Sequence, residues 1–238
     1  MDRPDILTAL LTRVARSPHP LALRGSLVTA LFIPERRAFD VDLLALEAAS
    51  LRELTALVDD LLADGLPAPT REATWVESEQ PGWRLRFGEA LQVDLGFGDP
   101  IVGGTVTASV AGVVVPVVRA ETMAAWKAHG IVEFGRGRFR AKDVWDLHAI
   151  LGRVQPFDHD RFARSLALAF ASRQTPLAMA DPLLHDVTWG GGRSSTRKWR
   201  ALARSGLVPA PLPPLLDVVA SLRASLGPVF ARLAAGEA

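Results

Sequence analysis

Residues 24–46 read RGSLVTALFIPERRAFDVDLLAL and combine a Gly-Ser pair, two adjacent arginines and two closely spaced aspartates. The end of this stretch, DVDLLAL, predicts an apolar strand, in which alternate side chains share one face. Asp40 and Asp42 would then point the same way, although two carboxylates repel each other and are costly to bury. A cation resolves that conflict, because Mg²⁺ prefers oxygen ligands and commonly shares them with substrate phosphates.

A third carboxylate lies in another apolar stretch, LQVDLGF at residues 91–97, which is also typical of a buried strand. If the two strands are neighbours, Asp94 lies beside Asp40 and Asp42. Three such carboxylates can hold two metal ions about 4 Å apart, which stabilises both the attacking and the leaving oxygens in phosphoryl transfer. The alternative is structural: Asp40 is a cap or turn residue and Asp42 faces solvent.

Gly25 and Ser26 form a small-residue turn upstream of the acidic pair. The backbone N–H groups of such a turn, together with the serine hydroxyl, can receive a triphosphate. Ser26 is also a good N-cap type, so we expect it to open a helix at 26–33. Arg36 and Arg37 lie just before the acidic pair, where they either meet a triphosphate or screen the aspartates.

The composition is that of a globular protein that can bury a core, with 238 residues, 49% hydrophobic and 22% charged. A formal net charge of +1 gives no global signal for nucleic acid or membranes, so any basic site must be local. The lack of cysteine excludes disulfides, thiolate metal sites and a cysteine nucleophile. The uncharged stretch 101–118 contains glycines and a proline, which favours two strands and a turn over a membrane span. We expect a cytoplasmic protein.

Periodicity divides the chain into a first half that alternates strands with helices and a second half of helices. After an amphipathic N-terminal helix, the expected strands are 21–25, 40–46, 74–77, 83–87, 91–97 and 112–118. The expected helices are 26–33, 46–64, 121–134, 142–151, 157–173, 196–204 and 214–234. We therefore expect an α/β core at residues 1–119 and a helical domain at residues 120–238.

Two basic clusters in the second half have alternative interpretations. FGRGRFRAK at residues 134–142 is either a solvated glycine turn or a phosphate clamp for a nucleotide or RNA. RSSTRKWRALAR at residues 193–204 surrounds Trp199, which can stack on an RNA end. Its helical spacing from Ala203 favours core packing instead. A serine or threonine at 194–196 is expected to cap this helix.

Four segments in order resemble one protein family: LRGS, RRAFDVDLL, LQVDLGFGD, and WKAHGIVEFGRGRFRAKDVWDLHAIL at residues 126–151. The chain is similar to the abortive-infection nucleotidyltransferase toxins of the AbiEii/AbiGii group, within the DNA polymerase β-like nucleotidyltransferase superfamily. The resemblance implies an α+β fold, with a polymerase β-like core built on a mixed sheet and followed by a helical C-terminal half. Arg24 stands where many relatives carry lysine.

The resemblance implies a role for each residue of the acidic site. Asp40 and Asp42 would bind Mg²⁺ that bridges the phosphates of the nucleotide. Asp94 would bind a second ion or act as the base for the attacking hydroxyl. Gly25 and Ser26 would hold the outer phosphates.

The resemblance also assigns residues of the helical half to the site. Lys127 would neutralise the triphosphate as a point charge. Arg37 of the first half, just before the acidic strand, is a further candidate nucleotide-binding residue. Asp143 would be a functional position that orients the lysine, although a helix-capping role is the structural alternative. Asp146 is equally well explained as a structural residue.

The activity that the resemblance implies is Mg²⁺-dependent transfer of a nucleoside monophosphate from an NTP to an acceptor hydroxyl, with release of pyrophosphate. The acceptor would be the 3′ end of tRNA, and the protein would be the toxin of a type IV toxin–antitoxin pair with a cognate antitoxin. A second possibility keeps the reaction and changes the acceptor to a protein hydroxyl. A third is a catalytically silent nucleotide- or partner-binding protein of the same fold.

Overall fold

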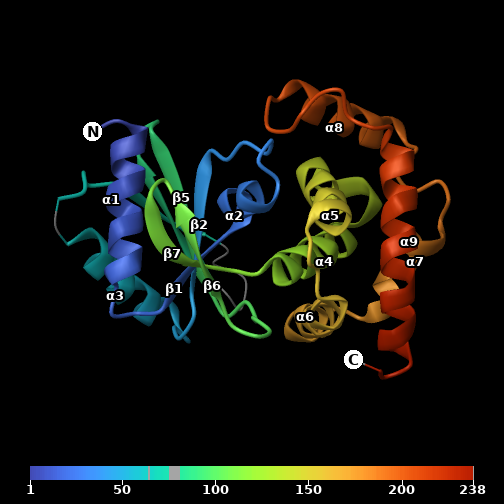
Figure 1. The fold of residues 1–238 in the computed structure, drawn as a ribbon, viewed down its shortest axis with the longest axis horizontal. Helices are drawn as coiled ribbons and strands as arrows, with labels where there is room; N and C mark the ends of the chain where they lie inside the picture. The colour runs from blue at the N-terminus through green and yellow to red at the C-terminus, as the bar shows by residue number, and fades with distance from the viewer. Residues whose placement is uncertain (64, 75–80, 238) are drawn as a thin grey trace. The chain divides into compact units, whose positions relative to one another are not determined.

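The computed structural model describes residues 1–63, 65–74 and 81–237 (Figure 1). The chain forms two compact units. The first, the sheet unit, consists of Met1–Leu31, Ala38–Asp99 and Gly104–Arg119. The second, the helical unit, consists of Phe32–Arg37, Pro100–Gly103 and Ala120–Ala238. The short segment 32–37 thus belongs to the helical unit, although it lies in sequence between two elements of the sheet unit.

The described residues of the sheet unit form a seven-stranded sheet in the order β3-β4-β5-β2-β1-β7-β6. Its strands are β1 Leu21–Arg24, β2 Asp40–Ala45, β3 Thr70–Thr74, β4 Gly82–Phe87, β5 Leu91–Phe97, β6 Val106–Val110 and β7 Val113–Val117. The β2–β5 and β1–β7 pairs are parallel, and the other pairs are antiparallel. The expected mixed sheet of an α+β fold is confirmed.

The described part of the sheet unit also contains helices α1 Arg3–Arg16, α2 Gly25–Phe32 and α3 Leu51–Leu62. The helix α1 packs against β7 and α3, while α2 lies on the other side of the sheet (Figure 1). Ser50 caps α3 by accepting a hydrogen bond from the Glu53 backbone N–H. This helix therefore begins five residues later than the expected start at residue 46, because the capping serine sets its first turn.

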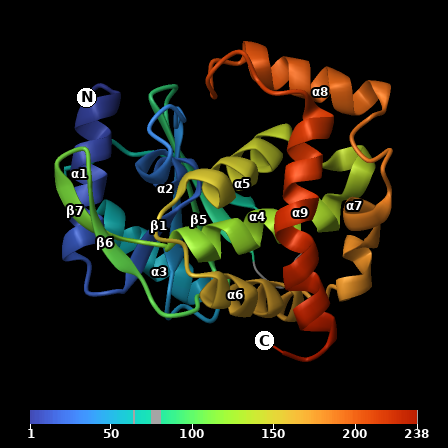
Figure 2. The ribbon, with the colours of Figure 1, turned by 45° about the vertical axis from the view of Figure 1, so that its right-hand side comes forward.

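The helical unit contains α4 Ala120–Arg138, α5 Ala141–Arg153, α6 His159–Ser172, a 3₁₀ turn Leu177–Ala180, α7 Asp181–His185, α8 Arg193–Arg204 and α9 Leu215–Ala234. Helix α4 packs against α5 on one side and α6 on the other, and α9 covers α5 and α7 (Figure 2). Leu147, Ile150 and Leu166 are fully buried in this core. A positive φ of 60° at Gly135 kinks α4 near its end.

Several expected boundaries differ from the structure. Helix α8 begins at Arg193 with Gly192 as its N-cap, so the expected serine or threonine cap within 194–196 is wrong. Helix α2 begins at Gly25, so Ser26 lies inside the first turn instead of capping it. The expected strand at 74–77 falls mostly outside the described residues, and β3 ends at Thr74. The expected pair of strands within 101–118 is confirmed as the β6–β7 hairpin.

None of the described helices is both long enough and apolar enough to cross a membrane.

Candidate active site

A row of four charged residues crosses the centre of the sheet. Arg24 of β1 is the register partner of Asp42 of β2, and Asp42 is in turn the partner of Asp94 of β5. Asp94 is paired with Arg84 of β4. Register partners on adjacent strands place their side chains on the same face, so the carboxylates of Asp42 and Asp94 are neighbours on one face of the sheet. Arg84 forms an ion pair with Asp94, whereas Arg24 forms one with Asp99, which follows β5.

Asp94 is held by its neighbour on the antiparallel strand. Arg84 donates from Nε to Oδ1 at 2.7 Å and from Nη2 to Oδ2 at 3.0 Å, a bidentate ion pair. Gln92 donates a third hydrogen bond to Oδ2 at 3.2 Å. The hydrogen bond to Asp94 outweighs burial and raises the pKa of Arg84 above its ordinary value. The sequence alone did not identify Arg84 as a site residue.

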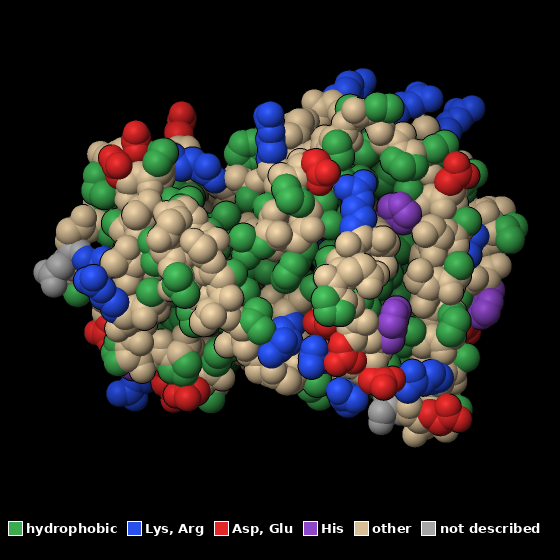
Figure 3. Space-filling view, in the orientation of Figure 1, with side chains coloured by type: hydrophobic (Ala, Val, Ile, Leu, Met, Phe, Trp, Pro, Cys, Tyr) green, Lys and Arg blue, Asp and Glu red, His purple; other side chains and the backbone are tan. Residues whose placement is uncertain are grey.

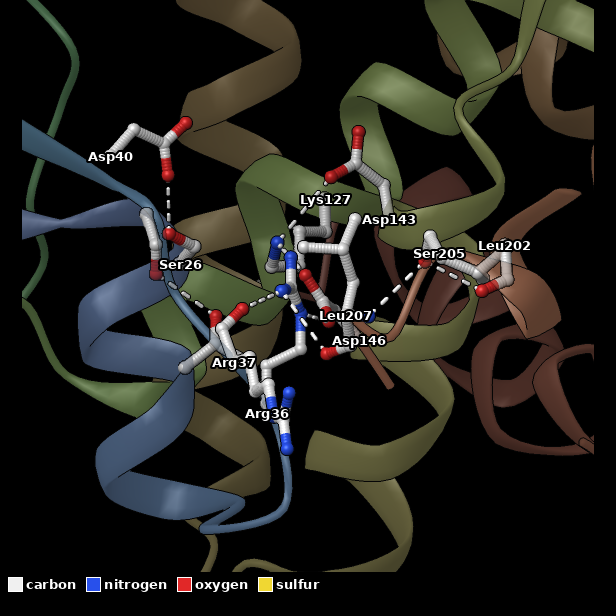
Figure 4. Close-up of polar contacts among 12 residues, drawn as sticks. Ser26, Arg36, Arg37, Asp40, Lys127, Asp143, Asp146, Leu202, Ser205 and Leu207 are labelled. Carbon is white, nitrogen blue, oxygen red and sulfur yellow. Dashed lines mark hydrogen bonds and ion pairs between the residues drawn. The ribbon is translucent and has the colours of Figure 1, made fainter. Parts of the chain in front are cut away.

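Asp40 is tied to the start of α2. The Ser26 hydroxyl donates to Asp40 Oδ1 at 2.6 Å (Figure 4). Asp40 is the residue two before Asp42 in β2, and the two therefore share a face. The serine hydroxyl thus links the turn after β1 to the first acid of β2 and orients that carboxylate.

Glycine is the only residue type that fits at position 25, between β1 and α2. The φ of Gly25 is +70°, a left-handed conformation that disfavours any side chain with a Cβ. A Cβ at this position would lie 1.8 Å from Asp42 Oδ2. The second acid of β2 therefore packs directly over the glycine backbone, which brings the Gly-Ser turn and the acidic pair together.

The three predicted metal ligands lie on two adjacent strands, but they do not form a closed cluster. Within residues 1–63, 65–74 and 81–237, no group of three or more His, Asp or Glu side chains converges to hold an ion. The donor set is nevertheless all oxygen, which suits Mg²⁺, and Asp42 and Asp94 lie on parallel strands about 4.8 Å apart. Arg84 and Gln92 already donate to both Asp94 oxygens, so a metal ion would bind at a remaining lone pair or replace one of these donors.

A second charged cluster lies in the helical unit. Lys127 of α4 donates from Nζ to Asp146 Oδ2 at 2.7 Å and to Asp143 Oδ1 at 3.4 Å, both on α5 (Figure 4). All three side chains are at most 10% exposed. Asp143 also pairs with Arg140 at 2.5 Å. The side chain of Asp143 therefore contacts Lys127 and Arg140 from the first turn of α5.

Arg36 joins this cluster from the segment 32–37. Its Nε donates to Asp146 Oδ1 at 2.8 Å, and the two side chains are 2% and 1% exposed. The next residue, Arg37, has an exposed side chain, while its backbone N–H donates to the Leu207 carbonyl at 2.9 Å. Only Arg37 of this arginine pair remains available for a nucleotide, and Asp146 is a structural centre between two cations.

Within this cluster, Lys127 and Asp143 both stay charged near neutral pH. Burial disfavours the ammonium form of Lys127, but attraction to Asp146 and Asp143 outweighs burial and raises its pKa. Burial likewise disfavours ionised Asp143, but Lys127 and Arg140 outweigh it and lower the pKa of Asp143 below its ordinary 3.8. Lys127 is therefore a fixed positive charge near neutral pH, not a group that exchanges protons.

The depressed pKa of Asp143 gives its contribution to stability a defined pH dependence. A carboxyl group whose pKa is lower in the folded chain stabilises it above the unfolded pKa and loses that effect as pH falls through the folded pKa. We expect Asp143→Asn to lower the free energy of unfolding by about 1.5–3 kcal/mol at pH 7, the range for hydrogen bonds to charged groups. Below about pH 4 the difference should shrink.

Urea unfolding of both proteins between pH 3 and pH 8 measures this difference. A difference that stays constant down to pH 3 would show that the amide at position 143 is destabilising for steric reasons and would contradict the electrostatic account.

Comparison with known proteins agrees with this architecture. A comparison with curated proteins gives no match. JHP933 from Helicobacter pylori superposes with a TM-score of 0.54 at 12% identity, over 98% of this chain and 93% of that chain. A second H. pylori structure, named as a candidate nucleotidyltransferase, superposes with a TM-score of 0.51 at 15% identity, over 99% of this chain and 96% of that chain. At these identities the likeness concerns the fold alone.

Sequence comparison with protein families gives a more specific result. The profile of the nucleotidyl transferase AbiEii toxin family, described as part of a type IV TA system, matches residues 9–221. This range includes β2 and β5, whose acids Asp40, Asp42 and Asp94 we call the acidic row, and the whole Lys127 cluster. The chain therefore belongs to the AbiEii family of type IV toxin–antitoxin systems and is a nucleotidyltransferase.

Proposed function

We propose that the protein transfers a nucleoside monophosphate from an NTP to the 3′-terminal hydroxyl of tRNA, in a Mg²⁺-dependent reaction that arrests growth. The observation that carries this proposal is the juxtaposition of Asp42 and Asp94 on adjacent strands, with Gly25 packed against Asp42. In the reaction, the acceptor oxygen bonds to the α-phosphorus, the bond to the bridging oxygen of the β-phosphate breaks, and pyrophosphate leaves.

We assign Asp40, Asp42 and Asp94 as the residues that hold Mg²⁺. The ion, when bound, neutralises the triphosphate and polarises the phosphoryl group. As the alternative to holding a second ion, Asp94 would accept the proton of the acceptor hydroxyl, with Arg84 keeping the carboxylate in place. The backbone N–H groups at Gly25 and Ser26 bind the outer phosphates in this proposal.

We further assign Lys127, Asp143 and Arg37 of the helical unit to the same reaction. Lys127 supplies a fixed positive charge for the triphosphate, and Asp143 positions its ammonium group through their contact at 3.4 Å. The exposed Arg37 follows in sequence the anchored Arg36 and precedes the acidic strand by three residues. Its guanidinium group suits bidentate binding of a phosphate.

The cellular setting follows from the substrates. NTPs and tRNA are cytoplasmic, so we place the protein there, with a cognate antitoxin as its partner. A protein Ser or Thr hydroxyl is the competing acceptor, because it presents the same nucleophile. Self-modification would also fall on Ser or Thr, since the chain contains no tyrosine.

The test is to incubate the protein with Mg²⁺, total cellular RNA and each α-labelled NTP in turn. We expect label on RNA of tRNA size with one or more of the nucleotides. Periodate-treated RNA, which has lost its terminal diol, is the matched acceptor control and should remain unlabelled. Label on protein would show that the acceptor is a side-chain hydroxyl and not tRNA. No label anywhere, with triphosphate binding intact, would leave a nucleotide-binding protein without catalysis.

A further inference from the structure

The region around α8 carries a local excess of positive charge. Residues 187–216 contain five cationic side chains and neither Asp nor Glu. The whole chain is nearly balanced, with 27 Lys and Arg against 26 Asp and Glu. The excess is therefore a property of this segment and not of the protein as a whole.

Four of these cations form one line along α8, which we call the α8 stripe: Arg193, Arg197, Arg200 and Arg204. Their spacing of four, three and four residues places them on a single helical face about 16 Å long. The side chains of the stripe are exposed, whereas Ser195, Trp199 and Leu202 on the other side are buried. Figure 3 shows Lys and Arg side chains gathered along α8 at the upper edge of this view.

The fifth cation has a different role. Lys198 donates to the Gly137 carbonyl at 2.7 Å and lies over the Phe139 ring at 5.0 Å. It therefore fastens α8 to the end of α4 within the helical unit. This leaves the stripe as a set of arginines only, on a helix whose position in the unit is fixed.

The stripe borders a shallow hollow of about 500 Å³, lined by its four arginines together with Gly191 and Thr196. None of the four forms an ion pair with a carboxylate in the part of the chain that the structure describes. Like charges three and four residues apart destabilise a helix by a few tenths of a kcal/mol per pair. The four arginines thus repel one another along α8 and line the same hollow. A bound anion would relieve that repulsion.

We propose that the α8 stripe binds the sugar–phosphate backbone of the RNA acceptor, an inference that rests on the proposed function for its choice of RNA. Arginine forks bind phosphates in a bidentate manner, and a line of them matches a line of phosphates. Trp199 is 7% exposed and donates from Nε1 to the Pro213 carbonyl, so it does not stack on a base. The stripe therefore contacts phosphates without reading the RNA sequence.

The experiment measures binding of fluorescent tRNA by anisotropy between 50 and 200 mM salt. Both tested proteins carry Asp40→Asn and Asp42→Asn, so that no turnover occurs. In the stripe variant Arg193, Arg197, Arg200 and Arg204 become Gln. In the control, four exposed arginines outside α8 become Gln, which gives the same change in net charge: Arg16, Arg52, Arg164 and Arg232.

We expect the stripe variant to bind tRNA at least about tenfold more weakly, with a log–log salt slope smaller by about three. The control should stay within about twofold of its parent. Glutamine is a good helix former, so circular dichroism should show both variants folded.

Equal tRNA affinity in the stripe variant and the control would overturn the inference, as would displacement of tRNA by polyglutamate as efficiently as by unlabelled tRNA. The second result would indicate an acidic protein partner. If tRNA binding depends on the stripe but the wild-type protein transfers no label to RNA, the inference holds and the proposed function fails. If the wild-type protein labels RNA but tRNA binding does not depend on the stripe, the proposed function holds and the inference fails.

Discussion

The Asp40→Asn, Asp42→Asn double variant should lose nucleotide transfer by at least about a thousandfold while it remains folded. A bound metal stabilises the charge of a phosphoryl-transfer transition state by several kcal/mol, and each 1.36 kcal/mol corresponds to a factor of ten in rate. Asparagine keeps the shape of each side chain and an oxygen that can accept the Ser26 hydrogen bond. It removes the negative charge that binds Mg²⁺.

The same substitutions should leave the free energy of unfolding unchanged or raise it, because they remove repulsion between acids that share a face of β2. Transfer is measured with the α-labelled NTP, and stability with urea. The control is Glu72→Gln on β3, an acid of the same sheet whose side chain is 61% exposed. If transfer survived in the double variant, the acidic row would not be the metal site, whatever the acceptor.

The placement of Asp40, Asp42 and Asp94 was predictable because it depends on local patterns. Alternation in a strand places Asp40 and Asp42 on one face, and the apolar context of Asp94 marks a second strand. The contribution of Arg84 was also within reach. Only residues 88–90 separate β4 from β5, and a hairpin loop this short fixes the register that pairs Arg84 with Asp94.

The start of α3 was also predictable from the local sequence, although apolar periodicity alone placed it too early. Ser50 and Glu53 form the spacing of a capping box, and the Glu53 carboxylate accepts a hydrogen bond from the Ala49 backbone N–H at 2.8 Å. Apolar periodicity alone extended the predicted helix back to residue 46. The capping signal is more local than the periodicity and therefore decides the boundary.

The role of Arg36 could not be read from the sequence. Arg36 and Arg37 are adjacent and chemically identical, yet one is buried against Asp146 and the other is exposed. The choice depends on a contact between residues 110 positions apart in sequence. Such a pairing follows from how α5 and the segment 32–37 pack together, and no local pattern contains that information.

The burial of this pair leads to the largest expected effect on stability. Asp146→Ala should lower the free energy of unfolding of the helical unit by about 3–5 kcal/mol, the range for removing one partner of a buried ion pair. Asp146 accepts from Arg36 Nε at 2.8 Å and from Lys127 Nζ at 2.7 Å. Without it, a buried guanidinium loses its carboxylate partner, and Lys127 keeps only the longer contact to Asp143.

Urea unfolding followed by tryptophan fluorescence measures the effect, because Trp126, Trp145, Trp189 and Trp199 all belong to the helical unit. Asp160→Ala is the matched control in the same unit. Its ion pair with Arg232 joins side chains that are 67% and 43% exposed, so we expect a loss of less than about 1 kcal/mol.

A fourfold replacement of Arg36 by Met, Asp146 by Leu, Lys127 by Met and Asp143 by Leu separates two explanations of a loss in Asp146→Ala. Apolar residues of similar volume often replace a buried ionic cluster without net destabilisation, since the cost of desolvating the charges disappears with them. We therefore expect the fourfold variant to recover most of the stability while it lacks the Lys127 charge and, with it, transfer activity. A fourfold variant as unstable as Asp146→Ala would show that packing around residue 146, not unpaired charge, accounts for the loss.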